Sequence, residues 1–444
     1  MVPMAPNDHR LIPDSLTFDP AWLASRRWFR SKARPLREVT VHDAAPLADD
    51  GWLLIVAAHF ADGGEAHYFV PVTLAAGRQA EPADGAGVWR SLVALMAGGQ
   101  QRIHGNRGEF VLEPTPALGE LLPGGADEAA RLEERRLQVE QSNTSVRLGD
   151  RLMLKLYRLL EPGINPEVEV MDFLTTVGFT RAPLLAGWIS YQDGALEPAA
   201  AAMIQSLVPA RGDAWGWMLE RLAAVPQGPV EALAAVAQIG GITAELHAAL
   251  RSRPELPGFP ARPATAAELE AWREGAHQQL TGALAALGGD DLRRLDELAP
   301  AVRQRFEEIA SASGVAVSRV HGDYHLGQLL AMDRGFVVTD FEGEPARPLA
   351  ERRLSSSPLR DVAGMLRSLE YAARTVERVE SGFAPESWLR DARTAFLAAY
   401  GGPGESPLLR ALELEKACYE VRYEANYRPD WVWLPLHALE RLAA

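Results

Sequence analysis

The segment from residue 320 to residue 371 constrains the chain most, because it places two acidic residues in settings that suit chemistry on a phosphate. Asp323 follows His321-Gly322, and an amide side chain, Gln328, comes five positions later. Asp340 directly follows the run 335–339, which has the pattern of a short buried strand, and it opens the sequence Asp-Phe-Glu-Gly. An isolated Asp after His-Gly is usually a turn residue. The order and spacing of the two acids favour a shared catalytic role instead.

Phosphoryl transfer to a hydroxyl is the reaction that this spacing indicates. Asp323 and Gln328 have the offset of the base Asp and the metal-binding Asn in a kinase catalytic loop. Asp340-Phe341 is similar to the start of the kinase Asp-Phe-Gly motif, with one residue inserted before the glycine. Asp323 is therefore predicted to take the proton of the acceptor hydroxyl. Asp340 and Gln328 are predicted to hold Mg²⁺ on the phosphates of ATP.

Two further residues are expected to brace the catalytic loop. His321 is assigned this structural role in preference to proton transfer. Asp361 follows Ser357-Pro358, a pair that suits the start of a helix, and it is expected to act there through its charge and its contacts with the loop.

A lysine for the nucleotide phosphates lies upstream, in the segment 150–157, whose alternating pattern predicts a strand. Glu169 comes fourteen positions after Lys155 and follows Pro166, which suits the first turn of a helix. Glu169 is predicted to pair with Lys155 and to hold it against the α- and β-phosphates. Glu167 is the alternative partner.

The remaining ATP contacts are predicted on both sides of that strand. The polar turn 140–146 takes the place of a glycine-rich phosphate loop, with Ser142, Asn143, Thr144 and Ser145 as donors. The apolar strand 201–207 leads into Val208-Pro209 and is expected to form the hinge near adenine, with Gln205 and Leu207 at its end. Because no GxxxxGK[ST] or GxGxxG motif occurs, neither a P-loop nor a Rossmann site is indicated.

The chain resembles the bacterial maltokinases, which belong to the aminoglycoside-phosphotransferase-like kinases. The resemblance extends from about residue 27 to near the C-terminus and is strongest in EQSNTSV, LKLYRLLEPGINPEVEV, HGDYHLGQ, DFEGEPARPLAERR and SPLRDVAGMLRS. Gln328 in place of Asn is typical of this branch. One departure is the run 28–32, Trp-Phe-Arg-Ser-Lys, where such proteins often have Trp-Phe-Gly-Gly-Lys.

This resemblance implies a bilobal protein-kinase-like α/β (α+β) fold with an additional strand-rich N-terminal cap domain and a mainly helical C-lobe. The implied domains are the cap domain (1–90), the N-lobe (91–207) and the C-lobe with the catalytic and sugar sites (208–444). The implied reaction is ATP- and Mg²⁺-dependent phosphorylation of maltose at its anomeric hydroxyl. Maltose 1-phosphate would feed α-glucan and glycogen synthesis, with trehalose synthase as a functional or physical partner.

A stripe of tyrosines near the C-terminus invites a sugar-binding role. Tyr419, Tyr423 and Tyr427 are four residues apart on a predicted helix, with Glu420 and Glu424 on the adjoining stripe. Aromatic faces and carboxylates are the groups that bind sugars, although an aromatic stripe is more often core. The similarity of this tail to that of maltokinases favours the sugar pocket. The predicted acceptor-binding residues are His325, Glu342, Tyr423, Glu424 and Trp431. For His325 a local loop contact is equally open, and Glu342 is equally open to a metal or an arginine partner.

Composition excludes several classes of protein. The 444 residues carry a formal charge of −14, which argues against broad nucleic-acid binding. The single cysteine, Cys418, allows no intrachain disulfide and fits a reducing compartment. The N-terminal residues lack the pattern of a signal peptide, and no apolar run approaches the roughly 20 residues that span a bilayer. A cytoplasmic protein without a membrane partner is expected.

Three rival functions remain open. The chain could phosphorylate another sugar or aminosugar such as glucosamine, or it could phosphorylate an aminoglycoside, whose cationic groups require a markedly acidic site. It could also be a non-catalytic partner module of trehalose synthase. The intact Lys155, Asp323 and Asp340 argue against this last alternative.

Overall fold

The computed structural model divides the chain into two compact units. The first comprises residues up to Thr176 together with Pro183–Val208, and the second comprises Val177–Ala182 and Pro209–Ala444. The structure describes residues 16, 18–47, 50–75, 78–137, 143–345, 347–379, 382–401 and 406–444. The main division falls beside Val208, close to the boundary expected at residue 207. The boundary at residue 90 stays a prediction.

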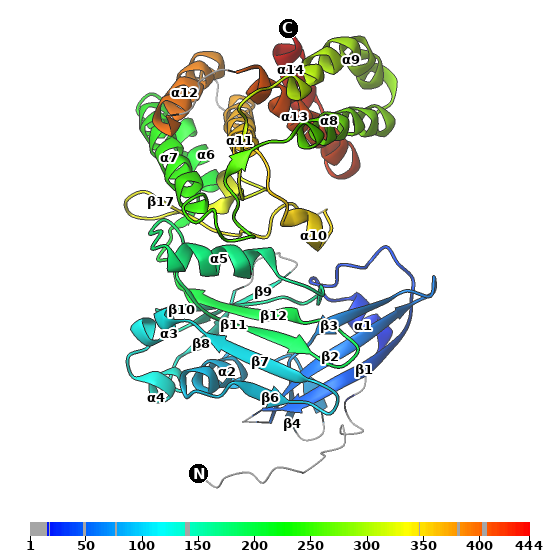
Figure 1. The fold of residues 1–444 in the computed structure, drawn as a ribbon, viewed down its shortest axis with the longest axis vertical. Helices are drawn as coiled ribbons and strands as arrows, with labels where there is room; N and C mark the ends of the chain where they lie inside the picture. Colours follow the sequence, from blue (N-terminus) through cyan, green and yellow to red (C-terminus); the bar gives the residue numbers. More distant parts are fainter. Residues whose placement is uncertain are drawn as a thin grey trace. The chain divides into compact units, whose positions relative to one another are not determined.

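The N-terminal part of the first unit is an antiparallel sheet built around β2 (Figure 1). After the short helix α1 (Pro20–Ala24), the sheet contains β1 (Leu36–Pro46), β2 (Gly51–Phe60), β3 (Glu65–Phe69), β4 (Val72–Ala75) and β5 (Arg78–Ala80). The abundance of strands expected in this part of the chain is therefore present. The apolar run 67–72 is divided between β3 and β4, with Pro71 between them. Proline lacks the N–H group that a continuous ladder would use.

The second sheet of this unit has seven antiparallel strands in the order β6-β7-β11-β12-β10-β9-β8. They are β6 (Arg102–His104), β7 (Glu109–Pro114), β8 (Glu134–Arg136), β9 (Thr144–Leu148), β10 (Leu152–Leu156), β11 (Leu185–Gln192) and β12 (Ala199–Ser206). Its helices are α2 (Val88–Ala97), α3 (Pro116–Leu121), α4 (Gly125–Ala129) and α5 (Pro166–Thr176). The strand containing Lys155 and the helix after Pro166 therefore lie where the sequence predicts them.

The two sheets share a core through β2, which is apolar on both faces. Leu53 and Ile55 belong to the core of the seven-stranded sheet, whereas Leu54 and Val56 belong to the core of the N-terminal sheet. All four side chains are fully buried. Successive residues of a strand point to opposite faces, so a continuous apolar run is what a strand packed on both sides requires.

The second unit is mainly helical, as expected (Figure 1). Its helices are α6 (Ala214–Ala223), α7 (Gly228–Leu250), α8 (Ala266–Ala286), α9 (Gly289–Ala310), α10 (Leu349–Arg352), α11 (Leu359–Glu377), α12 (Pro385–Tyr400), α13 (Pro407–Tyr427) and α14 (Trp433–Ala443), with 3₁₀ turns η1 (Leu326–Gln328) and η2 (Pro429–Trp431). One small sheet contains β13 (Gly212–Asp213), β16 (Leu329–Ala331) and β17 (Phe336–Val338). A second contains β14 (Arg262–Pro263) and β15 (Ala316–Val317).

Local signals define the ends of these helices well. Thr265 caps α8 by accepting the N–H of Glu268, while the Glu268 carboxylate accepts the N–H of Thr265. The tyrosine helix α13 ends at Tyr427, two residues before Pro429, because the residue before a proline is disfavoured in helical geometry.

Helix α7 is the exception to the expectation that no apolar stretch could span a bilayer. Among the described residues, Gly228–Leu250 is long and apolar enough to cross a membrane by length and composition alone. Half of its most apolar window is buried inside the protein, where α7 packs against α6 and α12. This packing accounts for its apolar composition.

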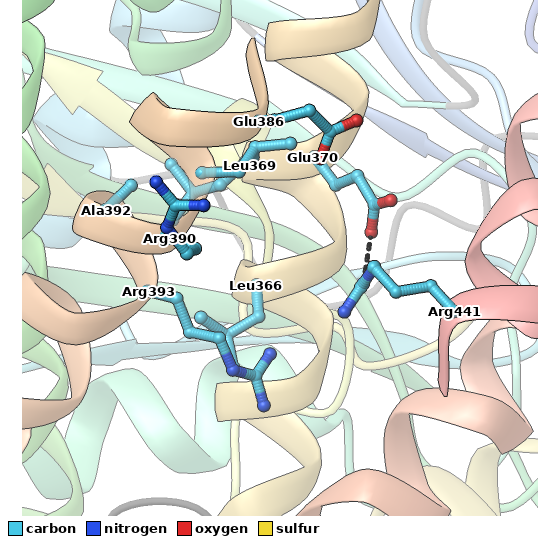
Figure 2. A pocket seen from close by; sticks show the side chains of 9 residues that line it. Leu366, Leu369, Glu370, Glu386, Arg390, Ala392, Arg393 and Arg441 are labelled. Atoms are coloured by element: carbon cyan, nitrogen blue, oxygen red, sulfur yellow. Dashed lines mark hydrogen bonds and ion pairs between the residues drawn. The ribbon is translucent and has the colours of Figure 1, made fainter. Parts of the chain in front are cut away.

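Buried charges connect α11 with α13 and α14. Arg367 of α11 is 1% exposed and donates to Glu420 of α13 at 2.7 Å and to Glu370. Figure 2 shows Glu370 reaching Arg441 of α14, whose guanidinium donates to it at 2.7 Å. Hydrogen bonds between carboxylate and guanidinium groups offset the cost of removing them from water. The network fixes the position of α13, the helix that carries the tyrosine stripe.

A buried carboxylate likewise joins the two sheets of the first unit. Asp43 of β1 is fully buried and accepts the N–H groups of Asn106 and Gly108, in the turn between β6 and β7, at 2.7 and 2.9 Å. It also accepts the hydroxyl of Tyr191 at 3.0 Å. Burial first, and Asp43 second, raise the pKa of Tyr191, so its hydroxyl keeps its proton and donates.

Replacing Asp43 by Ala should lower the free energy of unfolding by about 3 kcal/mol, because several buried donors lose a charged acceptor together. Urea unfolding of the purified variant measures this. Asp62→Ala is the control, since Asp62 is an exposed carboxylate in the turn between β2 and β3 that pairs with Arg34, and its loss should change stability little. Equal effects of the two substitutions would show that Asp43 does not stabilise the junction.

Candidate active site

The first unit presents a lysine on β10 whose partner is on α5. Lys155 Nζ donates to Glu167 Oε2 at 2.7 Å, and the hydroxyl of Tyr157 donates to the same oxygen at 2.7 Å. Glu167 is 2% exposed, and Asn165 caps its helix by accepting the N–H groups of Glu167 and Val168. The pairing holds the ammonium in one place on the sheet.

The observed partner of Lys155 is thus the alternative, Glu167, and not the first choice, Glu169. Residues two apart on a helix project in nearly opposite directions, so a helix that aims Glu167 at the lysine aims Glu169 away from it. Glu169 lines a separate cavity together with Asp172 and Trp188. The sequence distance of fourteen residues could not distinguish the two helix faces.

The polar turn contributes one side chain to the face of Lys155 and one to the opposite face. Ser145 lies directly across from Lys155 in the β9–β10 ladder, so the two share a face of the sheet. Thr144 is buried, and its Oγ1 accepts from Arg158 Nε at 2.9 Å. Its predicted role as a phosphate donor is therefore corrected to a structural one. Asn143 is partly exposed, and Ser142 lies outside the described residues.

The predicted hinge residues end β12. Gln205 is partly exposed and pairs with Met153 of β10 and Leu185 of β11. The N–H group of Leu207 donates to the carbonyl of Arg151 at 2.6 Å. This N–H group is therefore used within the unit, and the place of Gln205 and Leu207 near adenine stays a prediction.

In the second unit, the catalytic loop is held by Asp361 at the start of α11. The Asp361 carboxylate is 1% exposed and accepts the N–H groups of His321 at 2.8 Å and Gly322 at 2.9 Å. Its Oδ2 also lies 3.0 Å from His247 Nε2 on α7. Burial alone would raise the pKa of Asp361, but the contacts with His247 and the loop outweigh it and lower the pKa. The ionised carboxylate therefore positions the residues next to Asp323.

His321 then connects this loop to the second acidic motif. Its Nε2 lies 3.0 Å from the carbonyl oxygen of Thr339, and its ring packs against Phe341 at 5.0 Å between centroids. The ring is 2% exposed, as expected of a residue that braces the loop. Gln328 is also bonded to the residue before Asp340, because the backbone carbonyl of Gln328 accepts the N–H of Thr339 at 2.9 Å.

Asp340 has an unusual backbone. Its φ of +65° lies in the left-handed region, which residues other than glycine rarely adopt. An oxygen of Asp340 lies within 4.8 Å of an oxygen of Glu342, which follows two residues later. Such strain persists where the surrounding structure imposes it, and it is concentrated at functional sites.

The two carboxylates gathered here fit magnesium, because Mg²⁺ prefers carboxylate and amide oxygens. The part of Gln328 in holding the ion stays a prediction. Glu342 was predicted as a sugar ligand, with metal support as an open alternative. Its place next to Asp340 favours the metal alternative.

A cavity of about 570 Å³ opens beside Asp323 within the second unit. Its lining comprises Asp323, His325, Pro345, Lys416, Tyr419, Arg422, Tyr423, Asn426 and Tyr427. Most of these residues come from α13, so the tyrosine stripe and the predicted base share one cavity. The volume is in the range of small-molecule sites.

Lys416 is one of the residues of this cavity that the sequence did not predict, and it lies closest to the chemistry proposed for Asp323. Its Nζ lies 3.5 Å from Asp323 Oδ1 and 4.6 Å from the centroid of the Tyr419 ring. Burial would lower the pKa of Lys416, but the nearby carboxylates, Asp323 first, raise it above the ordinary value. The available signal was helical spacing, since Lys416 is three residues before Tyr419 on the same stripe.

The predicted acceptor-binding residues differ in whether they line this cavity. Tyr423 is 43% exposed and lines the cavity, so it is not core, and its ring stacks on Tyr419. His325 also lines the cavity, and desolvation there lowers its pKa, although its Nδ1 accepts the N–H of Gly327. Glu424 and Trp431 do not line it.

Both exclusions have physical reasons. Glu424 is 1% exposed, and Arg428 and the Tyr371 hydroxyl donate to its carboxylate, so its role as a sugar ligand is corrected to a structural one. Trp431 lies on η2 after the helix has ended, where the guanidinium groups of Arg378 and Arg428 cover its ring.

Comparison with known proteins agrees with this arrangement. Residues 133–396 match the phosphotransferase enzyme family, and residues 22–101 match the maltokinase N-terminal cap domain. A glucosamine kinase from Streptacidiphilus jiangxiensis is 30% identical over 321 residues, 68% of this chain and 72% of that protein. A glucosamine kinase from Mycolicibacterium smegmatis is 34% identical over 330 residues, 70% of this chain and 79% of that protein.

Solved structures extend the similarity to nearly the whole chain. A glucosamine kinase in complex with glucosamine, ADP and inorganic phosphate matches with a TM-score of 0.73 and 27% identity, over 95% of this chain and 98% of its own. Another crystal form of glucosamine kinase gives a TM-score of 0.76 and 28% identity, over 98% and 99%. The expected kinase-like fold with a strand-rich N-terminal cap and a helical C-terminal region is confirmed. The chain therefore belongs to the phosphotransferase enzyme family and is a maltokinase-like, capped member of it.

Proposed function

We infer that the chain transfers the γ-phosphoryl group of ATP to a hydroxyl of a neutral sugar, with maltose as the acceptor and its anomeric hydroxyl as the nucleophile. The observation that carries this proposal is the cavity beside Asp323, which joins a carboxylate base to tyrosine faces. Tyrosine rings stack on the C–H faces of sugars, and the cavity contains three of them on one helix.

The described residues divide the chemistry among them. Asp323 accepts the proton of the sugar hydroxyl as its oxygen attacks the γ-phosphorus, and the bond from that phosphorus to the bridging oxygen breaks to release ADP. Lys155, held by Glu167, binds the α- and β-phosphates. Asp340, Glu342 and Gln328 would hold Mg²⁺, which neutralises charge on the phosphates. The protein contributes mainly position and charge.

The charge of the cavity favours a neutral acceptor over a cationic one. Two cationic residues line it, Lys416 and Arg422, and the only carboxylate among its lining residues is that of Asp323. An aminoglycoside would bring several ammonium groups to this wall and meet like charge at short range. A neutral disaccharide meets no such penalty.

Glucosamine is the second candidate, because the relatives described above are named glucosamine kinases, one of them with glucosamine bound. The maltokinase cap domain supports maltose instead. Supply of maltose 1-phosphate to α-glucan synthesis, and a partnership with trehalose synthase, belong to the same proposal.

The acceptor is tested by a panel of sugars scored for ADP release, with maltose, glucosamine and kanamycin at equal concentrations. We expect kcat/KM for maltose to exceed that for glucosamine at least about tenfold, a difference of about 1.4 kcal/mol. Phosphorus NMR of the product should place the ester on the anomeric carbon. A higher kcat/KM for glucosamine than for maltose would make glucosamine the acceptor.

Asp323→Asn is the matched control for the same assay. The variant should bind ATP as the wild type does and lose turnover at least about 100-fold, because general-base catalysis is lost. Retention of more than about a tenth of wild-type turnover would remove Asp323 from this role. A wild-type protein that releases no ADP with any sugar would favour the non-catalytic partner module.

The lysine pair gives an expectation for the nucleotide. Glu167→Gln should raise KM for ATP about tenfold, since a charge-assisted hydrogen bond to Lys155 becomes a neutral one. Glu169→Gln, on the same helix, should change it little. Steady-state kinetics at saturating sugar measures KM for ATP in both variants. A larger effect of Glu169→Gln would favour Glu169, the first prediction, as the functional partner of Lys155.

The tyrosine stripe gives an expectation for the sugar. Tyr423→Ala should raise KM for the sugar about fivefold, because loss of one stacking face costs about 1 kcal/mol, and should leave KM for ATP unchanged. Trp431→Ala is a close control, since Arg428 covers both rings, at 5.6 Å from Tyr423 and 5.5 Å from Trp431. If both variants affect ATP and sugar equally and lower the melting temperature, the stripe only supports the fold.

A further inference from the structure

Arg158 is a fully buried cation at the junction of the two sheets of the first unit. It comes two residues after β10 and has no exposed surface. Burial lowers its pKa to about 10, with Glu81 opposing the shift, so it stays charged at neutral pH. A buried charge is retained only when specific partners satisfy it.

The partners of Arg158 come from two different parts of the chain. From the N-terminal sheet, Glu81 Oε1 accepts Nη2 at 3.2 Å and the carbonyl of Phe69 accepts Nη1 at 3.3 Å. The ring of Trp28 lies 4.8 Å from the guanidinium carbon. From the seven-stranded sheet, Thr144 Oγ1 accepts Nε at 2.9 Å. One planar fork therefore binds the cap domain on one side and the first residue of β9 on the other.

The cap domain holds this cation from several directions. Glu81 Oε1 also accepts the indole N–H of Trp28 at 3.1 Å. The backbone is tied as well, because the N–H of Phe69 donates to the carbonyl of Arg158 at 2.8 Å. Arg158 is thus fixed by the cap domain independently of Thr144.

Thr144 begins β9, in the part of the predicted phosphate-binding turn that the structure describes. Its neighbour Ser145 lies opposite Lys155, and the alternation of the strand sends the two side chains to opposite faces. Fixing the Thr144 hydroxyl from the core side therefore sets where Ser145 and the end of the turn stand on the nucleotide side. A rigid support of this kind keeps a binding geometry preorganised.

We propose that the cap domain positions the start of β9, and with it Ser145 beside Lys155, through the chain Trp28–Glu81–Arg158–Thr144, and that Glu81 and Arg158 are positioning residues for ATP. The inference rests on the proposed function, since it assumes that ATP binds beside Lys155. It gives the cap domain a part in nucleotide affinity, without contact between the cap domain and the nucleotide.

The test compares Thr144→Val, which keeps the shape and removes the acceptor oxygen, with Thr144→Ser, which keeps the oxygen. Calorimetry gives Kd for ATP and ADP, and kinetics gives KM for ATP and for the sugar. Thr144→Val should raise Kd and KM for ATP about tenfold and leave KM for the sugar unchanged. Thr144→Ser should restore wild-type values, and Glu81→Gln should act in the same direction as Thr144→Val.

The control is Thr40→Val, which removes a cap-domain hydroxyl that contacts His59 and not Arg158. This variant should change neither Kd and KM for ATP nor KM for the sugar. The inference is overturned if Thr144→Val and Glu81→Gln lower the melting temperature while Kd for ATP stays at the wild-type value. A wild-type protein that binds ATP but phosphorylates no sugar overturns the proposed function alone, because the nucleotide affinities of the variants still decide this inference.

Discussion

The catalytic half of this protein depends on one buried carboxylate. Asp361 holds two consecutive N–H groups of the loop that leads to Asp323, and His247 holds Asp361 in turn. His321, fixed by its N–H, carries the constraint on to Thr339 and so to Asp340. The proposed general base, Asp323, and the proposed metal-binding carboxylate, Asp340, are therefore placed by one network. Side chains that contact no substrate in this scheme fix the distance between the two groups that do.

Charge balance shapes the acceptor side in the same way. Lys416 approaches Asp323 from α13, and α13 is held by Glu420, whose partner Arg367 is buried on α11. Since α11 also carries Asp361, a single helix supports both the loop of Asp323 and the wall of the proposed sugar cavity. The base and the acceptor wall consequently share a rigid support, which is what in-line attack by a positioned hydroxyl requires.

Sequence patterns predicted the elements whose information is local. The strand of Lys155, the helix after Pro166 and the helix of the tyrosine stripe all depend on neighbouring residues, and they appear where expected. The face of a helix or strand on which a given side chain finds its partner was less predictable. Glu167 and Glu169 differ only in helix phase, and Thr144 and Ser145 only in strand phase, so the partner across space decides each role. Glu424 could be recognised as structural only from Tyr371 and Arg428, because its position on the stripe looks the same in either role.

The cap domain shows why partners that are distant in the sequence cannot be predicted from local patterns. Arg158 unites Trp28, Glu81 and Thr144, residues between 14 and 130 positions away from it in sequence, and nothing in the local pattern of any of them marks it for a buried cation. Burial makes the association strong, because an arginine without water must find all its acceptors inside the protein. A domain that supplies those acceptors cannot shift without disturbing the strand next to Lys155. The shared core on both faces of β2 and the charge at Arg158 therefore make the cap domain part of the frame that supports Lys155 and the nucleotide site proposed beside it.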